Sequence, residues 1–260
     1  MEVKILEKNN EKIKFLAEGI TSALAGELRR IMMMEIPTLA IEWVDFLKND
    51  SVIWDEIIAN RLSLIPLKYN IKFYNLKDNC KCGGKGCTRC QVKLKLKKKG
   101  PSMVYSGDLV PSDKKVKPVY DKIPIVELTE EQELQFEAIA QLGFGKEHAK
   151  WQASVVGYRN VPKINIGKGA NISEYTKRCP KNVFVFKKKK LKVKKLLECN
   201  LCMQCVEVSE GKIKVEPDET KYLFQVETTS GLKPEEIVLN SIEVLTKKLN
   251  EFSKDLRKLK

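Results

Sequence analysis

The N-terminal third of the chain alternates apolar and polar residues in patterns that predict strands and helices. Residues 3–16 alternate around Asn9-Asn10 and predict a β-hairpin. In residues 22–36 the apolar side chains recur at helical spacing, so this segment predicts an amphipathic helix, capped by Thr21 or Ser22 and ended by Pro37. Its core stripe comprises Leu24, Leu28, Ile31 and Met32.

A second side of this predicted helix is also partly apolar. At 100° per residue, Met33 and Met34 fall well off the core stripe, on a flank that they share with Arg29 and Arg30. We interpret this flank as a surface for another element or another chain. The alternative is an ordinary core helix with some exposed methionine.

Further along, residues 38–46 predict a strand, 54–62 a helix and 92–96 a strand. Thr129 as N-cap and Gln132 at the capping-box position predict a helix that ends on Gly143. Alternating segments predict two more strands, at 183–186 and 221–228. The mixture predicts an α+β protein.

The C-terminal segment has a heptad pattern. A helix over residues 234–260 would be about 40 Å long, which exceeds the core of a small domain. We therefore expect part of it to meet another chain, although the helix at 22–36 is an alternative partner for one end. The apolar positions are spaced by three and four residues: Ile242, Leu245, Leu249, Phe252, Leu256 and Leu259.

Composition narrows the class of protein. With 260 residues and 43% hydrophobic content the chain can bury a real core, and no apolar run is long enough to span a membrane. The first residues lack the apolar stretch of a signal peptide, so we expect a cytoplasmic protein in which clustered cysteines act as metal or cofactor ligands.

Charge and histidine content bear on function. The net charge of +14 is compatible with a nucleic-acid-associated role, but a surface rich in Lys and Glu is also typical of thermophilic proteins. The single histidine, His148, leaves no Ser-His-Asp set, and it is interpreted as a packing or capping residue beside Trp151. We predict no catalytic residues.

The first of two cysteine groups is a short loop. Its four thiols lie within eleven positions and are separated by three glycines, which allows the loop to close tetrahedrally on one ion. Zn²⁺ is the favoured ion, and free thiols or an iron–sulfur cluster are the alternatives. The residues are Cys80, Cys82, Cys87 and Cys90.

The second group has the spacing of a bacterial-type ferredoxin. Cys199, Cys202 and Cys205 form a Cys-x₂-Cys-x₂-Cys run, and a distant Cys179 precedes Pro180. This pattern predicts one [4Fe–4S] cluster, or [3Fe–4S] if Cys179 is out of reach, with a Cys₄ zinc site as the alternative. The basic run at 187–195 is interpreted as a solvated hairpin that could contact nucleic acid or an acidic partner.

Five blocks of sequence, taken together, resemble a known family. The chain resembles the D subunit of archaeal RNA polymerase, a relative of the N-terminal domain of the bacterial alpha subunit and of the eukaryotic third-largest polymerase subunit. Two departures are Gly26-Glu27, where the family has Asn-Ala, and the first cysteine loop, which many archaeal members lack. The blocks are residues 28–41, 58–67, 107–109, 148–151 and 226–228.

The resemblance implies a discontinuous dimerisation domain (1–38 plus 220–260), an inserted domain (39–165) containing the 80–90 loop, and a ferredoxin-like cluster domain (166–219). It also implies a heterodimer with the small L subunit, contacts with the N and P subunits, and a platform for the large catalytic subunits. The chain would contact DNA only indirectly, through the complex. The catalytic magnesium would belong to the largest subunit. The expected partner interface comprises Arg29, Arg30, Met33, Met34, Leu245, Leu249, Phe252 and Leu256.

Two other functions remain open from the residues. The ferredoxin-like cysteines would also suit an electron-transfer component of an oxidoreductase, although the basic charge and single cluster argue against it. The lysine runs would suit a separate zinc and nucleic-acid-binding protein, but they lack interleaved aromatic residues for base stacking.

Overall fold

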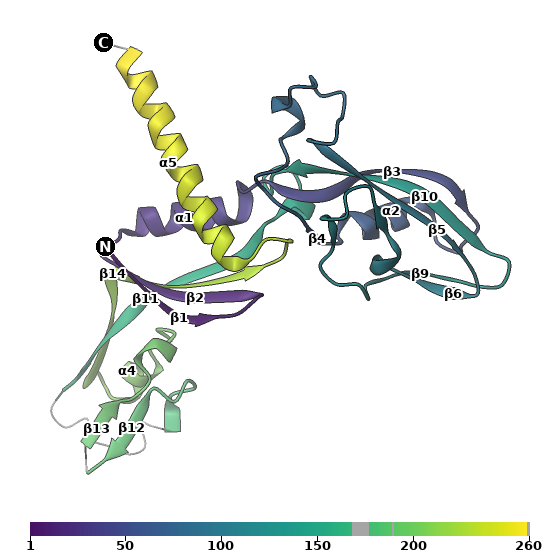
Figure 1. The fold of residues 1–260 in the computed structure, drawn as a ribbon. Coiled ribbons are helices and arrows are strands. Elements are labelled where there is room, and N and C mark those ends of the chain that lie inside the picture. The colour runs from purple at the N-terminus through teal and green to yellow at the C-terminus, as the bar shows by residue number, and fades with distance from the viewer. Residues whose placement is uncertain (168–176, 189, 259–260) are drawn as a thin grey trace. The chain divides into compact units, whose positions relative to one another are not determined.

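A computed structural model of the chain describes residues 1–167, 177–188 and 190–258 (Figure 1). It divides into two compact units. The first comprises residues 1–29 and 156–226, and the second comprises residues 30–155 and 227–260. None of the described helices is long and apolar enough to cross a membrane.

The first unit is built on a four-stranded sheet in the order β1-β2-β14-β11. The predicted N-terminal hairpin is confirmed: the side chain of Asn9 accepts hydrogen bonds from the amides of Glu11 and Lys12 at 2.9 and 2.7 Å, which closes the turn. In the sheet, Phe15 stacks on Phe224 with ring centroids 5.0 Å apart. The strands are β1 (Glu2–Lys8), β2 (Lys12–Glu18), β11 (Ser154–Ile166) and β14 (Ile213–Thr228).

A small subdomain lies beyond the ends of β11 and β14 in the same unit (Figure 1). It contains β12 (Phe184–Lys187), β13 (Lys190–Val193), the 3-10 turn η4 (Leu196–Glu198) and helix α4 (Gln204–Val208). Its core is formed by Val183, Phe184, Leu191, Cys199, Ile213 and Val215.

Helix α1 (Ser22–Met34) confirms the predicted amphipathic helix. The hydroxyl of Thr21 accepts a hydrogen bond from the Leu24 amide at 3.3 Å, so Thr21 is the cap. Ile31 and Met32 of the predicted core stripe are buried, whereas Leu24 and Leu28 are only half-buried. The helix thus has a core side and an incompletely covered side.

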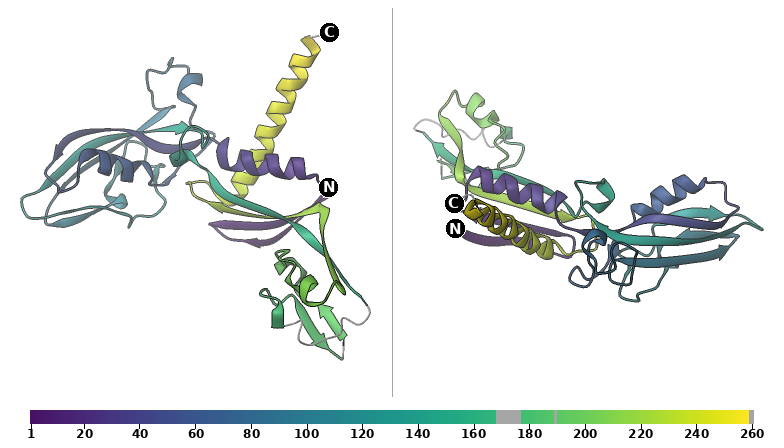
Figure 2. Two further views of the ribbon diagram at one scale, coloured as in Figure 1. Left: turned by 180° about the vertical axis from the view of Figure 1, so that it is seen from behind. Right: turned by 90° about the horizontal axis from the view of Figure 1, so that it is seen from above.

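The second unit is organised around a sheet in the order β3-β10-β5-β7. Helix α2 (Asp55–Ser63) lies along one face of this sheet, with Ile58 and Leu62 fully buried (Figure 2). The predicted strand at 38–46, helix at 54–62 and strand at 92–96 are therefore confirmed. The strands are β3 (Thr38–Asn49), β5 (Gln91–Lys99), β7 (Val110–Pro111) and β10 (Glu133–Gly143).

Short elements complete the second unit. Two pairs of short strands form separate two-stranded sheets: β4 (Leu67–Lys68) with β8 (Lys117–Pro118), and β6 (Ser102–Tyr105) with β9 (Pro124–Leu128). The 3-10 turns are η1 (Lys77–Asn79), η2 (Ser106–Asp108) and η3 (Ala149–Trp151).

The helix predicted to begin at Thr129 is wrong, because residues 133–143 form β10, the strand between β3 and β5. The amide of Thr129 donates to the Gln132 side chain at 2.8 Å, so the apparent capping box closes a turn between β9 and β10. Beyond it, Leu134, Phe136 and Ala138 are fully buried and alternate with half-exposed residues. This period-two burial between two strands outweighs the local helix-start signal.

Helix α5 (Pro234–Lys258) confirms the predicted C-terminal helix over its described length. Its 25 residues correspond to about 37 Å. Only Pro234, Ile237 and Ser241 are buried, and every residue from Thr246 to Lys258 is exposed. Leu259 of the predicted seam and Lys189 of the basic run lie outside the described residues, as does the segment 168–176.

Candidate metal centres and subunit interface

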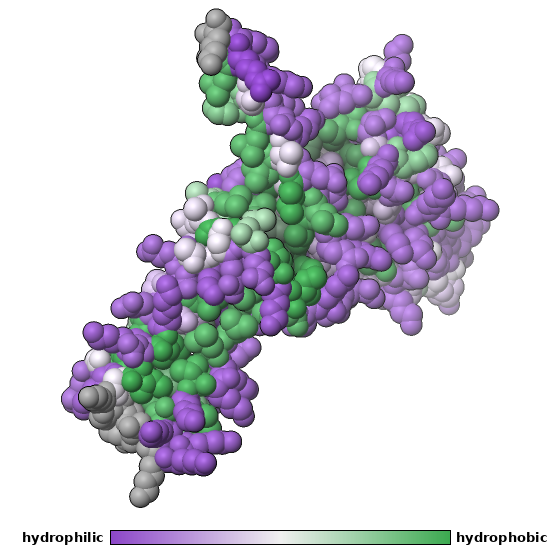
Figure 3. Space-filling view, turned by 60° about the vertical axis from the view of Figure 1, so that its left-hand side comes forward, coloured by the Kyte–Doolittle hydropathy of each residue, from purple (hydrophilic) through white to green (hydrophobic). Residues whose placement is uncertain are grey.

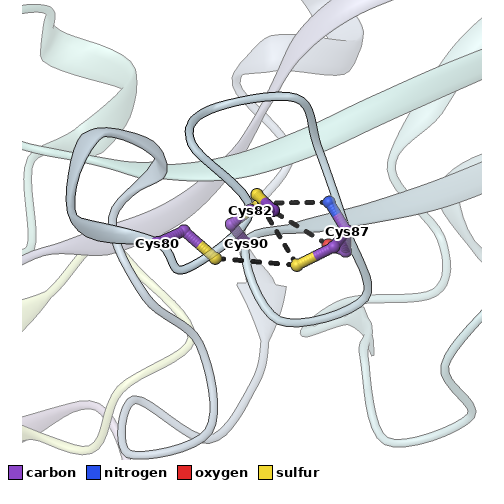
Figure 4. A group of neighbouring side chains, drawn as sticks. All are labelled: Cys80, Cys82, Cys87 and Cys90. Atoms are coloured by element: carbon purple, nitrogen blue, oxygen red, sulfur yellow. Dashed lines mark hydrogen bonds between the residues drawn. The ribbon is translucent and has the colours of Figure 1, made fainter.

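The first cysteine group forms a compact tetrad in the second unit (Figure 4). All four sulfur atoms lie within 4.8 Å of one another. The separations are 3.6 Å for Cys80–Cys87, 3.7 Å for Cys82–Cys90 and 3.8 Å for Cys87–Cys90. A tetrahedral ion with Zn–S bonds of about 2.3 Å places its sulfur ligands about 3.8 Å apart, so the tetrad has the dimensions of a structural zinc site.

Local backbone geometry explains how so short a loop closes. Gly83, Gly84 and Gly86 have φ values of 63°, 78° and 89°, a left-handed conformation that side chains disfavour. The loop is also attached to the segment before it. The Arg89 guanidinium lies 4.3 Å from the centroid of the Phe73 ring and donates to the Phe73 carbonyl at 3.2 Å.

The thiols of this tetrad differ in pKa. Burial raises the pKa of Cys90 to about 12. Burial also opposes ionisation of Cys82, but hydrogen bonds from neighbouring thiols and from the Gly86 amide outweigh it and lower the pKa of Cys82 to about 6. Four thiolates this close would repel one another, so a cation is needed for all four to ionise together.

The second cysteine group converges in the small subdomain of the first unit. Cys179, Cys199, Cys202 and Cys205 line one cavity together with Val183, Phe184 and Val215. Burial raises the pKa of Cys205, and the charges of the other three cysteines raise it further. The amide of Val183 donates to the Cys179 sulfur at 3.5 Å. The chain therefore brings Cys179 to the other three.

The two groups differ in how closely their sulfur atoms approach. Among the residues that the structure describes, the first tetrad is the only set of three or more cysteine, histidine or carboxylate ligands that all lie within 4.8 Å of one another. The second group lines a shared cavity, but no three of its sulfur atoms all lie within 4.8 Å of one another. In this group Leu201 and Met203 have φ values of 59° and 61°, so the backbone turns twice in a left-handed conformation between the cysteines.

The predicted interface residues of α1 are in different environments. The Arg29 side chain donates to the Val156 carbonyl at 3.0 Å, so it is partly engaged within its own unit. Arg30 is exposed, Met33 is half-buried and Met34 is 37% exposed. The two methionines therefore offer more uncovered apolar surface than a core helix would.

The predicted residues of α5 form an uncovered stripe. Leu249, Phe252 and Leu256 are 59%, 63% and 48% exposed, and Leu245 is half-buried. At 100° per residue these four side chains continue the side of the helix that is buried at its first turns. Figure 3 shows hydrophobic side chains following one side of this helix, with hydrophilic ones beside them.

Some exposed apolar residues and contacts were not predicted. Trp43, Val52 and Trp54 in the second unit are 59%, 77% and 77% exposed, and the Arg89–Phe73 contact supports the metal loop. A tryptophan just before a helix and an arginine between two cysteines are weak signals by themselves. His148 caps η3, because its Nδ1 accepts from the Lys150 amide at 3.1 Å, as the sequence interpretation expected.

The chain matches one RNA polymerase domain in part and several RNA polymerase subunits over nearly their whole length. Residues 44–158, which include β5, α2, β10 and the second half of β3, match the RNA polymerase Rpb3/RpoA insert domain. This segment is therefore of the class of RNA polymerase subunit domains. The chain is 41% identical to DNA-directed RNA polymerase subunit Rpo3 of Methanosphaera stadtmanae over 263 residues, which cover 97% of each chain.

Two further relatives agree. Identity to the Rpo3 subunit of Archaeoglobus fulgidus is 38%, covering 99% of this chain and 98% of that one. Identity to the Rpo3 subunit of Pyrococcus furiosus is 40%, covering 100% and 98%. The chain belongs to the family of archaeal DNA-directed RNA polymerase subunit Rpo3, also called the D subunit, which confirms the resemblance seen in the sequence.

Proposed function

We propose that this chain is the non-catalytic assembly subunit of an archaeal RNA polymerase. It forms a heterodimer with the small L subunit, and the pair provides the platform on which the N and P subunits and the two large catalytic subunits assemble. The observation that carries the proposal is the apolar stripe of α5, which continues past the last buried turn of the helix.

The stripe supports a helical partner. Leu249, Phe252 and Leu256 are separated by three and four residues, the spacing by which two helices interlock. Leaving these side chains in water is unfavourable, and the described residues of the second unit do not cover them. Met33 and Met34 of α1 add adaptable apolar surface to the same proposed interface.

We further propose that Zn²⁺ occupies the tetrad at residues 80–90. Its soft thiolate donors, its sulfur separations and its closed four-ligand geometry all support structural zinc. The ion would fix the loop between η1 and β5 and would allow all four thiols to ionise. It would have no catalytic role, because all four positions are protein ligands.

For the second group we propose one [4Fe–4S] cluster in a ferredoxin-like domain spanning residues 166–219. The Cys-x₂-Cys-x₂-Cys spacing, the cavity that all four cysteines line and the Val183 amide directed at Cys179 support a cluster. The cluster would supply one-electron chemistry when bound. In this chain we assign it a structural role, since tying residue 179 to the segment 199–205 stabilises a subdomain whose core is small.

Co-expression with an archaeal L subunit tests the assembly proposal. Gel filtration with light scattering should give a 1:1 heterodimer, and the chain alone should self-associate through its exposed stripe. Elemental analysis of anaerobically purified heterodimer should give about four iron atoms and one zinc ion per chain. A chain that remains monomeric with L present would overturn the heterodimer, whereas a heterodimer without iron would overturn only the cluster.

A further inference from the structure

Two rows of lysine in this chain have the same spacing, but only one of them has carboxylates beside it. The first lies on β5, where side chains at every second position point to one face. Each ammonium has a carboxylate neighbour on β10: Lys93 and Lys95 lie 2.6 and 3.2 Å from Glu137, and Glu133 is shared by the others. The paired lysines are Lys93, Lys95, Lys97 and Lys99.

The second row lies on β13 and the residue that follows it, in the small subdomain, and has no such neighbours. Lys190, Lys192 and Lys194 occupy alternate positions and are all exposed, while Leu191 between them is buried in the subdomain core. Lys187 pairs with Lys190 across the β12–β13 hairpin. Within the described part of the chain, no carboxylate lies within 4.0 Å of any of these four ammonium groups.

The row belongs to the most basic part of the sequence. Residues 177–214 contain twelve Lys and Arg but three Asp and Glu, so they carry +9 of the +14 net charge. Like charges placed next to each other across a hairpin repel, and a fold gains nothing from holding them there unpaired. An anionic ligand would remove this repulsion.

We propose that the exposed face of the β12–β13 hairpin binds the phosphate backbone of nucleic acid without reading its sequence. This proposal goes beyond the assembly function and does not depend on either metal centre. It differs from the expectation that the chain meets DNA only through other subunits. Lys190 to Lys194 extend over about 13 Å, a length along which duplex DNA presents roughly eight phosphate charges.

Side-chain chemistry favours nucleic acid over an acidic protein. The basic residues between 187 and 195 are all lysine, a residue that is depleted from protein–protein interfaces, where arginine and aromatic residues are enriched. Phe184 is buried and Phe186 pairs with Leu191 on the core side, so the basic face offers no ring for stacking on bases. These features suit contact with phosphates alone.

The test measures how binding to a random-sequence duplex depends on salt. The full chain, in complex with L where that complex forms, is titrated by fluorescence anisotropy between 50 and 200 mM salt. The triple variant Lys190→Gln, Lys192→Gln, Lys194→Gln should lower the slope of log K against log salt by about 2.7, at about 0.9 per phosphate contact. Raising the salt from 50 to 200 mM should therefore weaken binding by the variant by a factor about 40 times smaller than the factor for the original chain.

A matched control removes the same charge from the paired row, by Lys93→Gln, Lys95→Gln, Lys97→Gln. This control should keep the slope, and a triple Lys→Arg variant at 190, 192 and 194 should also keep it. An unchanged slope in the β13 variant, or an equal loss in the β5 control, would overturn the proposal. Competition by polyglutamate as effective as that by DNA of the same charge would also overturn it, in favour of an acidic protein.

Discussion

The exposed stripe of α5 allows the strength of the proposed heterodimer to be perturbed predictably. Full burial of a leucine or phenylalanine side chain contributes about 1.5–3 kcal/mol. Leu249 and Phe252 are still 59% and 63% exposed, so about 1–2 kcal/mol for each side chain remains to be gained at the partner. The double variant Leu249→Ala, Phe252→Ala should therefore weaken the heterodimer by about 2–4 kcal/mol, or about 30- to 700-fold in Kd.

The assay is the Kd for L, measured by isothermal titration calorimetry or by competition between labelled heterodimers. The matched control is Asn250→Ala, Lys254→Ala, which changes two exposed residues of the same turns on the opposite side of the helix. The control should change Kd by less than about threefold. Both variants should keep the free energy of unfolding of the chain, because none of the four side chains is buried.

Two outcomes would refute this reasoning. If the stripe variant bound L with an unchanged Kd, α5 would not be the contact surface. If the stripe variant unfolded at lower temperature than the control while still binding L, the stripe would be covered within the chain itself, and its exposure would not indicate a partner.

Three more predictions concern the metal centres and one ion pair. Cys202→Ser should abolish bound iron while leaving the heterodimer intact, and iron retained in elemental analysis would contradict the ligand assignment. Cys87→Ser should remove zinc and leave iron unchanged, so equal loss of both metals would argue against two separate sites. Burial opposes ionisation of Asp108, but hydrogen bonds from the Lys98 ammonium at 2.5 Å and the Tyr105 amide hold its pKa below the usual range. Asp108→Asn should therefore be less stable to denaturant at neutral pH, and the difference should close as pH falls below about 4; a pH-independent difference would contradict this.

The sequence predicted correctly those elements in which the spacing of apolar residues and the flanking residues indicate the same structure. The hairpin at Asn9, α1 after Thr21 and α5 after Pro234 all combine a regular period with a capping or turn residue, and all three are present. Between residues 129 and 143 the flanking residues indicate a helix, whereas the chain forms a strand. Thr129 and Gln132 have the spacing of a helix start, and only the pairing of β10 with both β3 and β5 decides for a strand.

For the candidate sites, spacing predicted which cysteines lie near one another but not how they are arranged. The eight cysteines divide correctly into two groups of four neighbours, because each group follows a recognisable spacing. The difference between a tetrad at 3.6–3.8 Å and a more open group depends on how β12, β13 and α4 pack, which no linear spacing contains. Likewise, the two lysine rows are equivalent as sequence and differ only because β10 brings Glu133 and Glu137 beside one of them.

Sedimentation of mixtures of purified subunits tests directly whether this chain brings the large subunits together. The two large catalytic subunits are mixed with this chain alone, with L alone, with the heterodimer, or with the heterodimer carrying Leu249→Ala and Phe252→Ala at a concentration below its Kd. Only the intact heterodimer should bring both large subunits into one sedimenting species. Association of the large subunits to the same extent without this chain, or with the stripe variant, would contradict its role as the assembly subunit.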